Sequence, residues 1–289
     1  MREIKYHNGE TINVDAIHFY GCSFVAGQEL MDAEIPDPMN ADIRTMAKQE
    51  KETTEDYYRR KLARELLFKK KQKLEKQLAW PQHFCGTLKV RCHNHGSHGA
   101  SMTEIKGTLL QDLVEKRIDK EKEAVFVGLT GFAREMIFTT KGTFNQRYMS
   151  ATGKPRSLVI ATDAERRGDP DLARKYMQIK CEYTHLWYFF QEVYNIINIC
   201  RAHEVRLYML PMLDPFSIGW YKKQYDIDLD QPSWVEQLRF IESEIDKYII
   251  EHGKLDPLGG NIVERLPRGH PCAESHKLYG TKVGEKLLT

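Results

Sequence analysis

Length, composition and charge restrict what this chain can be. Its 289 residues are 41% hydrophobic, which is enough to bury the core of one large domain. A formal net charge of +2 excludes the strong basic excess that marks many nucleic-acid and membrane-surface binders. The first residues lack an apolar signal core, and no apolar run reaches the ~18 residues that cross a bilayer. We therefore expect a cytoplasmic protein, in the host cytoplasm if the chain is viral. Six cysteines without a Cys-x-x-Cys pair predict reduced thiols.

Strand and helix patterns alternate along the chain. Buried-strand patterns lie at residues 16–20, 88–92, 124–128 and 205–213. From residue 172 to residue 200, apolar residues recur at spacings of four and three. This spacing predicts a long helix whose apolar stripe packs on the sheet or contacts another subunit. We therefore predict an α/β fold for residues 1–289: one domain with a mostly parallel sheet between two helical layers, a three-layer α/β/α sandwich.

Residues 41–80 have the composition of a helical insertion. They contain 12 Lys and Arg against 7 Asp and Glu, a net charge of +5. Apolar residues recur in this segment at helical spacing: Tyr58, Leu62, Leu66, Leu74 and Leu78. We expect one or two amphipathic helices, whose basic face is solvated or contacts phosphates or an acidic partner.

A second insertion is predicted at residues 135–163. Apolar and polar residues alternate around Lys141-Gly142, which predicts a β-hairpin. Because the segment follows the strand expected at 124–128, we place the hairpin at the rim of the crevice at the carboxyl edge of the sheet.

Residues 18–27 contain Gly-x-Ser-x-x-x-Gly, at the point where an apolar strand pattern gives way to a turn and a helix. At the carboxyl end of a buried parallel strand, Ser23 would project into the crevice where open α/β sheets bind ligands. The helix that follows would aim N–H groups at a developing anion. Two alternatives stay open. Either Ser23 caps the helix, or the nucleophile is Cys22, whose side chain points the opposite way in an extended segment.

Three further motifs end or follow strands, at residues 94–101, 124–130 and 268–277, and the last contains His270-Pro271. A serine block, a glycine block, a third block and a His-Pro block in this order resemble the SGNH (GDSL-like) hydrolases. The likeness is closest to divergent, phage-type members of that superfamily. It implies an SGNH, flavodoxin-like fold over nearly the whole chain.

The resemblance implies roles for individual residues. Ser23 corresponds to the nucleophile and His270 to the general base. The backbone N–H groups of Ser23 and Gly99 would form the oxyanion hole. Thr130 stands where the family has an asparagine, so its hydroxyl, or the side chain of Arg134, would supply the remaining donor.

The acid of the family's catalytic triad is missing from its usual place. The family has an aspartate three residues before the histidine, and this chain has Pro267 there. A Ser-His dyad would then do the chemistry alone, or Asp256 or Glu264 would reach the ring of His270 from another loop.

Asn94, Arg134 and His276 are the candidate substrate contacts. Arg134 would bind a carboxylate or phosphate, or form a structural salt bridge. His276 lies in the first turn of an expected helix, where it would face solvent or cap a neighbour. We expect no metal, since Cys92 and the histidines of residues 93–98 share one glycine-containing loop instead of forming two separated ligand pairs.

The family resemblance implies a serine esterase that needs no cofactor. Its substrate would be a small-molecule, glycan, lipid or nucleoside ester. A membrane is not an expected partner, nucleic acid is disfavoured, and a homo-oligomer stays open. The alternative from another class is a catalytically silent binding or structural protein of the same fold, of a viral kind. It would use residues 41–80 to contact a partner or nucleic acid.

Overall fold

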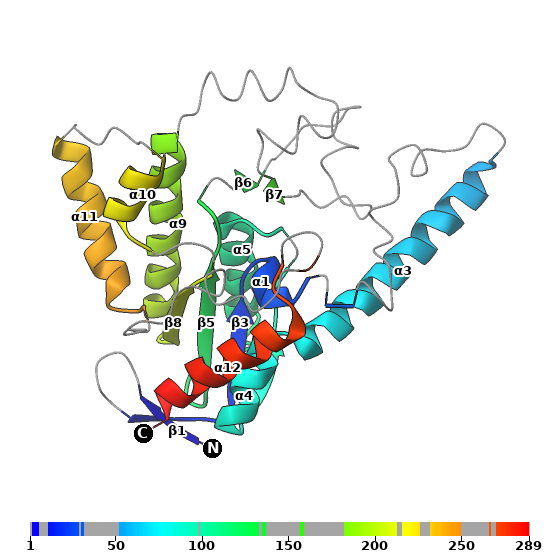
Figure 1. Ribbon diagram of the computed structural model, residues 1–289, viewed down its shortest axis with the longest axis horizontal. Coiled ribbons are helices and arrows are strands. Elements are labelled where there is room, and N and C mark those ends of the chain that lie inside the picture. Colours follow the sequence, from blue (N-terminus) through cyan, green and yellow to red (C-terminus); the bar gives the residue numbers. More distant parts are fainter. Residues whose placement is uncertain are drawn as a thin grey trace.

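A four-stranded parallel sheet forms the centre of the protein in this computed structural model (Figure 1). The structure describes residues 2–5, 11–28, 30–31, 52–97, 99–132, 135–136, 157–158, 182–212, 216–225, 232–249, 266 and 270–288. The strands, in spatial order, are β4 (Arg91–Asn94), β3 (Ala16–Tyr20), β5 (Glu123–Leu129) and β8 (Arg206–Pro211). Each neighbouring pair is parallel. Parallel neighbours require crossover connections, and the chain supplies helices for them.

Helices cover both faces of this sheet, so the predicted α/β class is confirmed. One face packs against α4 (Trp80–Leu88) and α12 (Ala273–Leu287). The other packs against α5 (Met102–Val114) and α9 (Glu182–Ala202). Alternate residues of β3 face opposite sides: Phe19 joins the α4 and α12 side, and Tyr20 joins the α5 and α9 side.

Smaller elements surround the sheet. An antiparallel pair, β1 (Arg2–Lys5) with β2 (Thr11–Val14), leads into β3. Helices α10 (Ile218–Tyr225) and α11 (Pro232–Asp246) lie beside α9 in Figure 1. Beyond β8, Met209 forms a parallel bridge with Ile249, so the chain approaches the sheet at a fifth position.

The long helix expected at residues 172–200 is confirmed where the structure describes it. Helix α9 begins at Glu182, and residues 172–181 lie outside the described part of the chain. Its apolar stripe is buried against the sheet: Leu186, Phe190, Val193, Ile197 and Cys200. Packing on the sheet therefore accounts for this stripe.

The strand predicted at residues 88–92 is confirmed as β4, but it begins three residues later than predicted, at Arg91. Leu88 is the last residue of α4, and Lys89 follows it with φ 56°, a left-handed conformation that ends the helix. Four apolar residues of α4 are buried at helical spacing: Trp80, Phe84, Cys85 and Leu88. The strand begins only at Arg91, because Leu88 is buried as the last residue of helix α4.

The amphipathic pattern expected within residues 41–80 is also wrong. One continuous helix, α3 (Thr54–Leu78), forms there, but Tyr58, Leu62 and Leu66 are exposed by 58–61%. The buried residues are instead Lys71 and Glu75, whose charged groups lie 3.8 Å apart. Figure 1 shows why: the first half of α3 projects away from the domain, so those apolar residues have no sheet to cover.

Within residues 135–163, two short strands pair antiparallel: β6 (Glu135–Met136) and β7 (Ser157–Leu158). The turn expected at Lys141-Gly142 lies outside the described residues. The described cysteines, which exclude Cys181, are free thiols. No helix in the described part of the chain has the length and apolarity needed to span a bilayer.

Candidate active site

Ser23 is the first residue of α1 (Ser23–Ala26), directly after the carboxyl end of β3. The N-cap position belongs to Cys22, whose backbone is extended with φ −84° and ψ −160°. The alternative that Ser23 caps the helix is therefore wrong. Ser23 is 4% exposed, and its place in the first turn directs the free N–H groups of α1 toward the same edge of the sheet.

Two glycines allow α1 to sit this close to the strands. A Cβ built on Gly21 would lie 2.2 Å from Cγ2 of Val25, and one built on Gly128 would lie 2.6 Å from the same atom. Gly21 directly follows β3 and Gly128 lies near the end of β5, so Val25 of α1 packs at the carboxyl ends of both strands. The helix that begins with Ser23 depends on the missing side chains at these positions.

Cys22 does not compete with Ser23 in this structure. Its side chain is fully buried in the apolar cluster on the α4 and α12 face of the sheet. A thiol in that place cannot reach a substrate, so the alternative nucleophile is not supported.

The loop after β4 runs beside the serine turn. The backbone N–H of Ser97 donates to the carbonyl of Gly21 over 2.9 Å. Gly99 follows with φ +77°, a left-handed conformation, and a Cβ built there would meet nothing within 4 Å. Gly99 therefore lies next to open space, and Ser101 then caps α5 by accepting from the N–H of Glu104.

Asn94 joins this loop to α1. Its Nδ2 donates to the carbonyl of Val25 over 2.8 Å, and its Oδ1 accepts from the N–H of Gly96 over 2.9 Å. These bonds position the loop relative to the serine helix. Substrate binding by Asn94 stays a prediction.

Thr130 follows the carboxyl end of β5 and is 3% exposed. Its Oγ1 has no hydrogen-bond partner among the described residues. A buried hydroxyl without a partner costs about 1–3 kcal/mol. The Thr130 hydroxyl is thus a buried hydrogen-bond donor without a partner among the described residues.

His270 comes to α1 from the far end of the chain. Its ring lies 5.5 Å from the ring of Phe24, measured between centroids, and Phe24 is the residue after Ser23. Two residues later, Cys272 occupies the N-cap position of α12, and this helix packs against α4. The fold therefore holds the histidine of the His-Pro pair against the helix that carries the serine.

His276 is fully buried, so the expectation that it faces solvent is wrong. Its Nδ1 accepts a hydrogen bond from the N–H of Trp80 over 3.1 Å, so the expected capping of a neighbouring helix, here α4, is confirmed. Burial, together with nearby His83 and His270, lowers the pKa of His276 to about 3. Burial and this hydrogen bond disfavour the expected substrate contact of His276, which stays a prediction.

Ser23, Gly99 and Thr130 thus follow the carboxyl ends of β3, β4 and β5, and His270 lies beside Phe24 of α1. Three other expected site residues lie outside the described residues: Arg134, Asp256 and Glu264.

A buried polar cluster on the α5 side of the sheet was missed in the sequence. His18 Nε2 lies 2.9 Å from Glu123 Oε2, and His18 Nδ1 lies 3.1 Å from His95 Nε2. His95 Nδ1 is 3.4 Å from Asp112 Oδ2, which also accepts a 2.8 Å hydrogen bond from the Tyr20 hydroxyl. The only available signal was the alternation that puts His18 and Tyr20 on one face of β3.

Burial dominates the electrostatics of this cluster. It lowers the pKa of His18 against the opposing effect of Glu123, and lowers the pKa of His95 against that of Asp112. Burial and the Asp112 contact raise the pKa of Tyr20. A histidine whose charge is suppressed in this way keeps a lone pair for a hydrogen-bond donor or a cation.

Solved structures with a similar arrangement include several esterases. A member of the lipolytic protein G-D-S-L family from Veillonella parvula shares 11% identity over 93% of this chain and 96% of that chain, with a TM-score of 0.40. A catalytic mutant of an acetylxylan esterase from Geobacillus stearothermophilus shares 12% identity over 95% and 94%, with a TM-score of 0.39. An alpha/beta hydrolase enzyme from the metagenome of Lake Arreo, Spain, shares 8% over 95% of each chain, with a TM-score of 0.42.

No family model matches the chain. No curated protein sequence matches it at the significance threshold. At these identities and TM-scores the likeness carries no conclusion, and both the fold and the proposed function of this chain rest on its own residues.

Proposed function

We propose that this protein is a serine hydrolase that cleaves acyl esters, with Ser23 as nucleophile and His270 as general base. One observation carries the proposal: α1 begins with a serine at the carboxyl end of a central parallel strand, and the ring of His270 packs against the next residue of that helix. Ligands of open α/β sheets bind at this edge.

The proposed mechanism needs a nucleophile, a general base and donors to the oxyanion. Ser23 Oγ attacks the ester carbonyl carbon while His270 takes the hydroxyl proton. The N–H groups of Ser23 and Gly99, together with the Thr130 hydroxyl, hold the oxyanion that forms. Collapse of the intermediate breaks the ester bond, and the leaving alcohol takes the proton from His270. Water then attacks the acyl-serine by the same route, which releases the acid and restores Ser23.

The exposure of Ser23 bears on which esters the protein cleaves. We favour a small-molecule or carbohydrate ester with a short acyl group, because Ser23 is only 4% exposed and a short chain such as acetyl reaches it most easily. Ester cleavage by this route requires no metal or organic cofactor.

The test is covalent labelling with a fluorophosphonate probe. The wild-type protein is expected to label at one site, because the probe captures a serine only when a base activates it. Ser23→Ala is expected to remain unlabelled, and mass spectrometry of wild-type peptides should place the adduct on Ser23. Labelling that survives Ser23→Ala would disprove the assignment, and Ser97→Ala, on the adjoining loop, is the matched control that should label normally.

Thr130→Val is expected to separate activity from stability. Valine keeps the shape but removes the hydroxyl, so kcat should fall by about 10²–10³ if Oγ1 donates to the oxyanion. The same change removes a buried hydroxyl without a partner, so the free energy of unfolding should stay level or rise by up to about 1 kcal/mol. Ester hydrolysis and urea unfolding measure the two effects, and an unchanged kcat would remove Thr130 from the site.

A binding protein without catalysis is the second candidate. It is favoured by a cavity of about 430 Å³ between α3 and β4, whose lining includes Lys69, Lys73 and Lys76. Folded protein that does not label, but binds single-stranded nucleic acid with an affinity that falls steeply with salt, would support this candidate over the hydrolase.

A further inference from the structure

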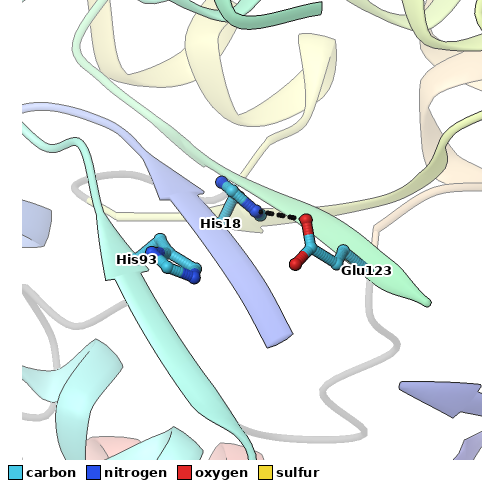
Figure 2. A group of neighbouring side chains, drawn as sticks. All are labelled: His18, His93 and Glu123. Carbon is cyan, nitrogen blue, oxygen red and sulfur yellow. Dashed lines mark hydrogen bonds and ion pairs between the residues drawn. The ribbon is translucent and has the colours of Figure 1, made fainter. Parts of the chain in front are cut away.

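Three metal-ligating side chains meet on one face of the sheet, away from Ser23. The possible ligand atoms of His18, His93 and Glu123 all lie within 4.8 Å of one another. Figure 2 shows His18 in the middle on β3, with His93 from β4 on one side and Glu123 from β5 on the other. We propose that these three residues bind a divalent transition-metal ion, zinc in the first instance.

Strand register brings the three residues together. His18 pairs with His93 across β3 and β4, and with Val125 across β3 and β5. Glu123 precedes Val125 by two residues, so it projects from the same face of the sheet. Donors from three adjacent strands therefore converge, although they are separated by 75 and 30 residues in the sequence.

The donor set is one that zinc prefers. Two imidazoles and one carboxylate, with water in the fourth position, occur at open zinc sites. Tetrahedral bonds of about 2.1 Å put donor atoms about 3.4 Å apart. The His18–Glu123 pair, at 2.9 Å, is already close, so the adjustment falls on His93. His93 is half-buried on the edge strand, and its ring stacks on that of His18 at 4.6 Å between centroids.

The other contacts orient this site. Metal-bound histidines usually donate their second N–H to another group, and His95 Nε2, 3.1 Å from His18 Nδ1, would accept that hydrogen bond when His18 binds an ion through Nε2. The backbone N–H of Asp119 donates to Glu123 Oε2 over 2.9 Å and fixes the carboxylate. Arg91 lies 3.4 Å from Glu123 Oε1, but its side chain is 67% exposed and can turn toward solvent when a cation binds.

A proton on His18 Nε2 also satisfies the contact with Glu123, but it gives His93 no role. The His93 ring adds a third ligand atom, a second nitrogen, beside the His18–Glu123 pair, and only a metal ion would use it. A bound ion would join the edge strand β4 to β3 and β5. The site is separate from the proposed hydrolase chemistry and does not depend on it.

Zinc binding by the full-length protein tests the proposal. After removal of metals with a chelator, the protein is titrated with zinc in competition with a chromophoric chelator. We expect one zinc per chain and a higher melting temperature with zinc than without. Cobalt in place of zinc should give visible absorption bands typical of tetrahedral nitrogen and oxygen ligation. All measurements are repeated with the Ser23→Ala variant. This variant lacks the proposed nucleophile, so zinc binding is tested independently of hydrolysis.

Variants locate the ion. His93→Asn and Glu123→Gln should each weaken zinc binding by more than about 100-fold, and His95→Asn by about 10–100-fold, since it acts through His18. His83→Asn, on α4 across the sheet, is the matched control and should bind zinc like the wild type. Circular dichroism without metal checks that each variant folds. Failure of the wild type to bind one equivalent, or wild-type affinity in both His93→Asn and Glu123→Gln, would overturn the proposal.

Discussion

Replacing His270 by glutamine is expected to slow the turnover of nitrophenyl acetate by about 10⁴–10⁶-fold, with KM changed only slightly. Glutamine fills similar space beside Phe24 but cannot take the proton from Ser23, so the serine hydroxyl stays a weak nucleophile. The loss should fall on kcat because the base acts in the transition state and not in ground-state binding. Steady-state kinetics at neutral pH measure both constants.

His203→Asn, just after α9, is the control and should leave both constants unchanged. A His270→Gln protein that keeps more than about a tenth of the wild-type turnover would show that another group is the base. The same assay on Asp256→Asn and Glu264→Gln separates a triad from a dyad. If one of them slows turnover by about a hundredfold or more, that residue is the acid, because loss of the acid disturbs the tautomer and orientation of the imidazole.

Gly21→Ala is expected to destabilise the fold by roughly 2–3 kcal/mol and to abolish probe labelling. A Cβ at this position would lie 2.2 Å from Cγ2 and 2.9 Å from Cβ of Val25, which is itself fully buried. Helix α1 would have to lift away from β3, and Ser23 would move with it. Urea unfolding monitored by circular dichroism gives the change in the free energy of unfolding.

Two further variants test that the cause is steric. Val25→Ala in the Gly21→Ala background should restore part of the stability, because it removes the atom that clashes. Gly107→Ala lies in the middle of α5, where a Cβ would meet nothing within 4 Å, and should stabilise the protein by about 0.5–1 kcal/mol. If Gly21→Ala is as stable as Gly107→Ala, the close approach of α1 is not a requirement of the fold.

The central strands could be predicted because their signal is local. Residues 16–20 match β3, and 124–128 lie within β5, since both strands are buried on two faces and are mostly apolar in sequence. The prediction of strand boundaries failed where the same local pattern fits a strand or a helix. Leu88 suits a strand or the last turn of a helix, and packing of α4 on the sheet decided for the helix.

The candidate site also contains residues with a local sequence signal and residues that only tertiary contacts bring to it. Ser23 was proposed because it follows a strand, and strand ends carry the ligands of this architecture. The roles of Gly99 and Thr130 came from the family resemblance, and all three roles stay predictions. His270 was placed by family resemblance, and only the tertiary contact with Phe24 brings it to the serine helix. The His18 cluster was missed because a histidine in a buried strand has no partner that its neighbours in sequence reveal.

By itself, the sequence determined the alternation of buried strands and helices, the serine turn and the glycines that this turn needs. Each depends on residues a few positions apart, because hydrophobic periodicity and backbone sterics are local properties. Tertiary structure alone decided which side chains meet. It exposed the apolar residues at the start of α3, buried His276 against α4, and set the register that joins His18 to His93 and Glu123. These depend on how distant segments pack, and strand register puts on one face residues that the sequence keeps far apart.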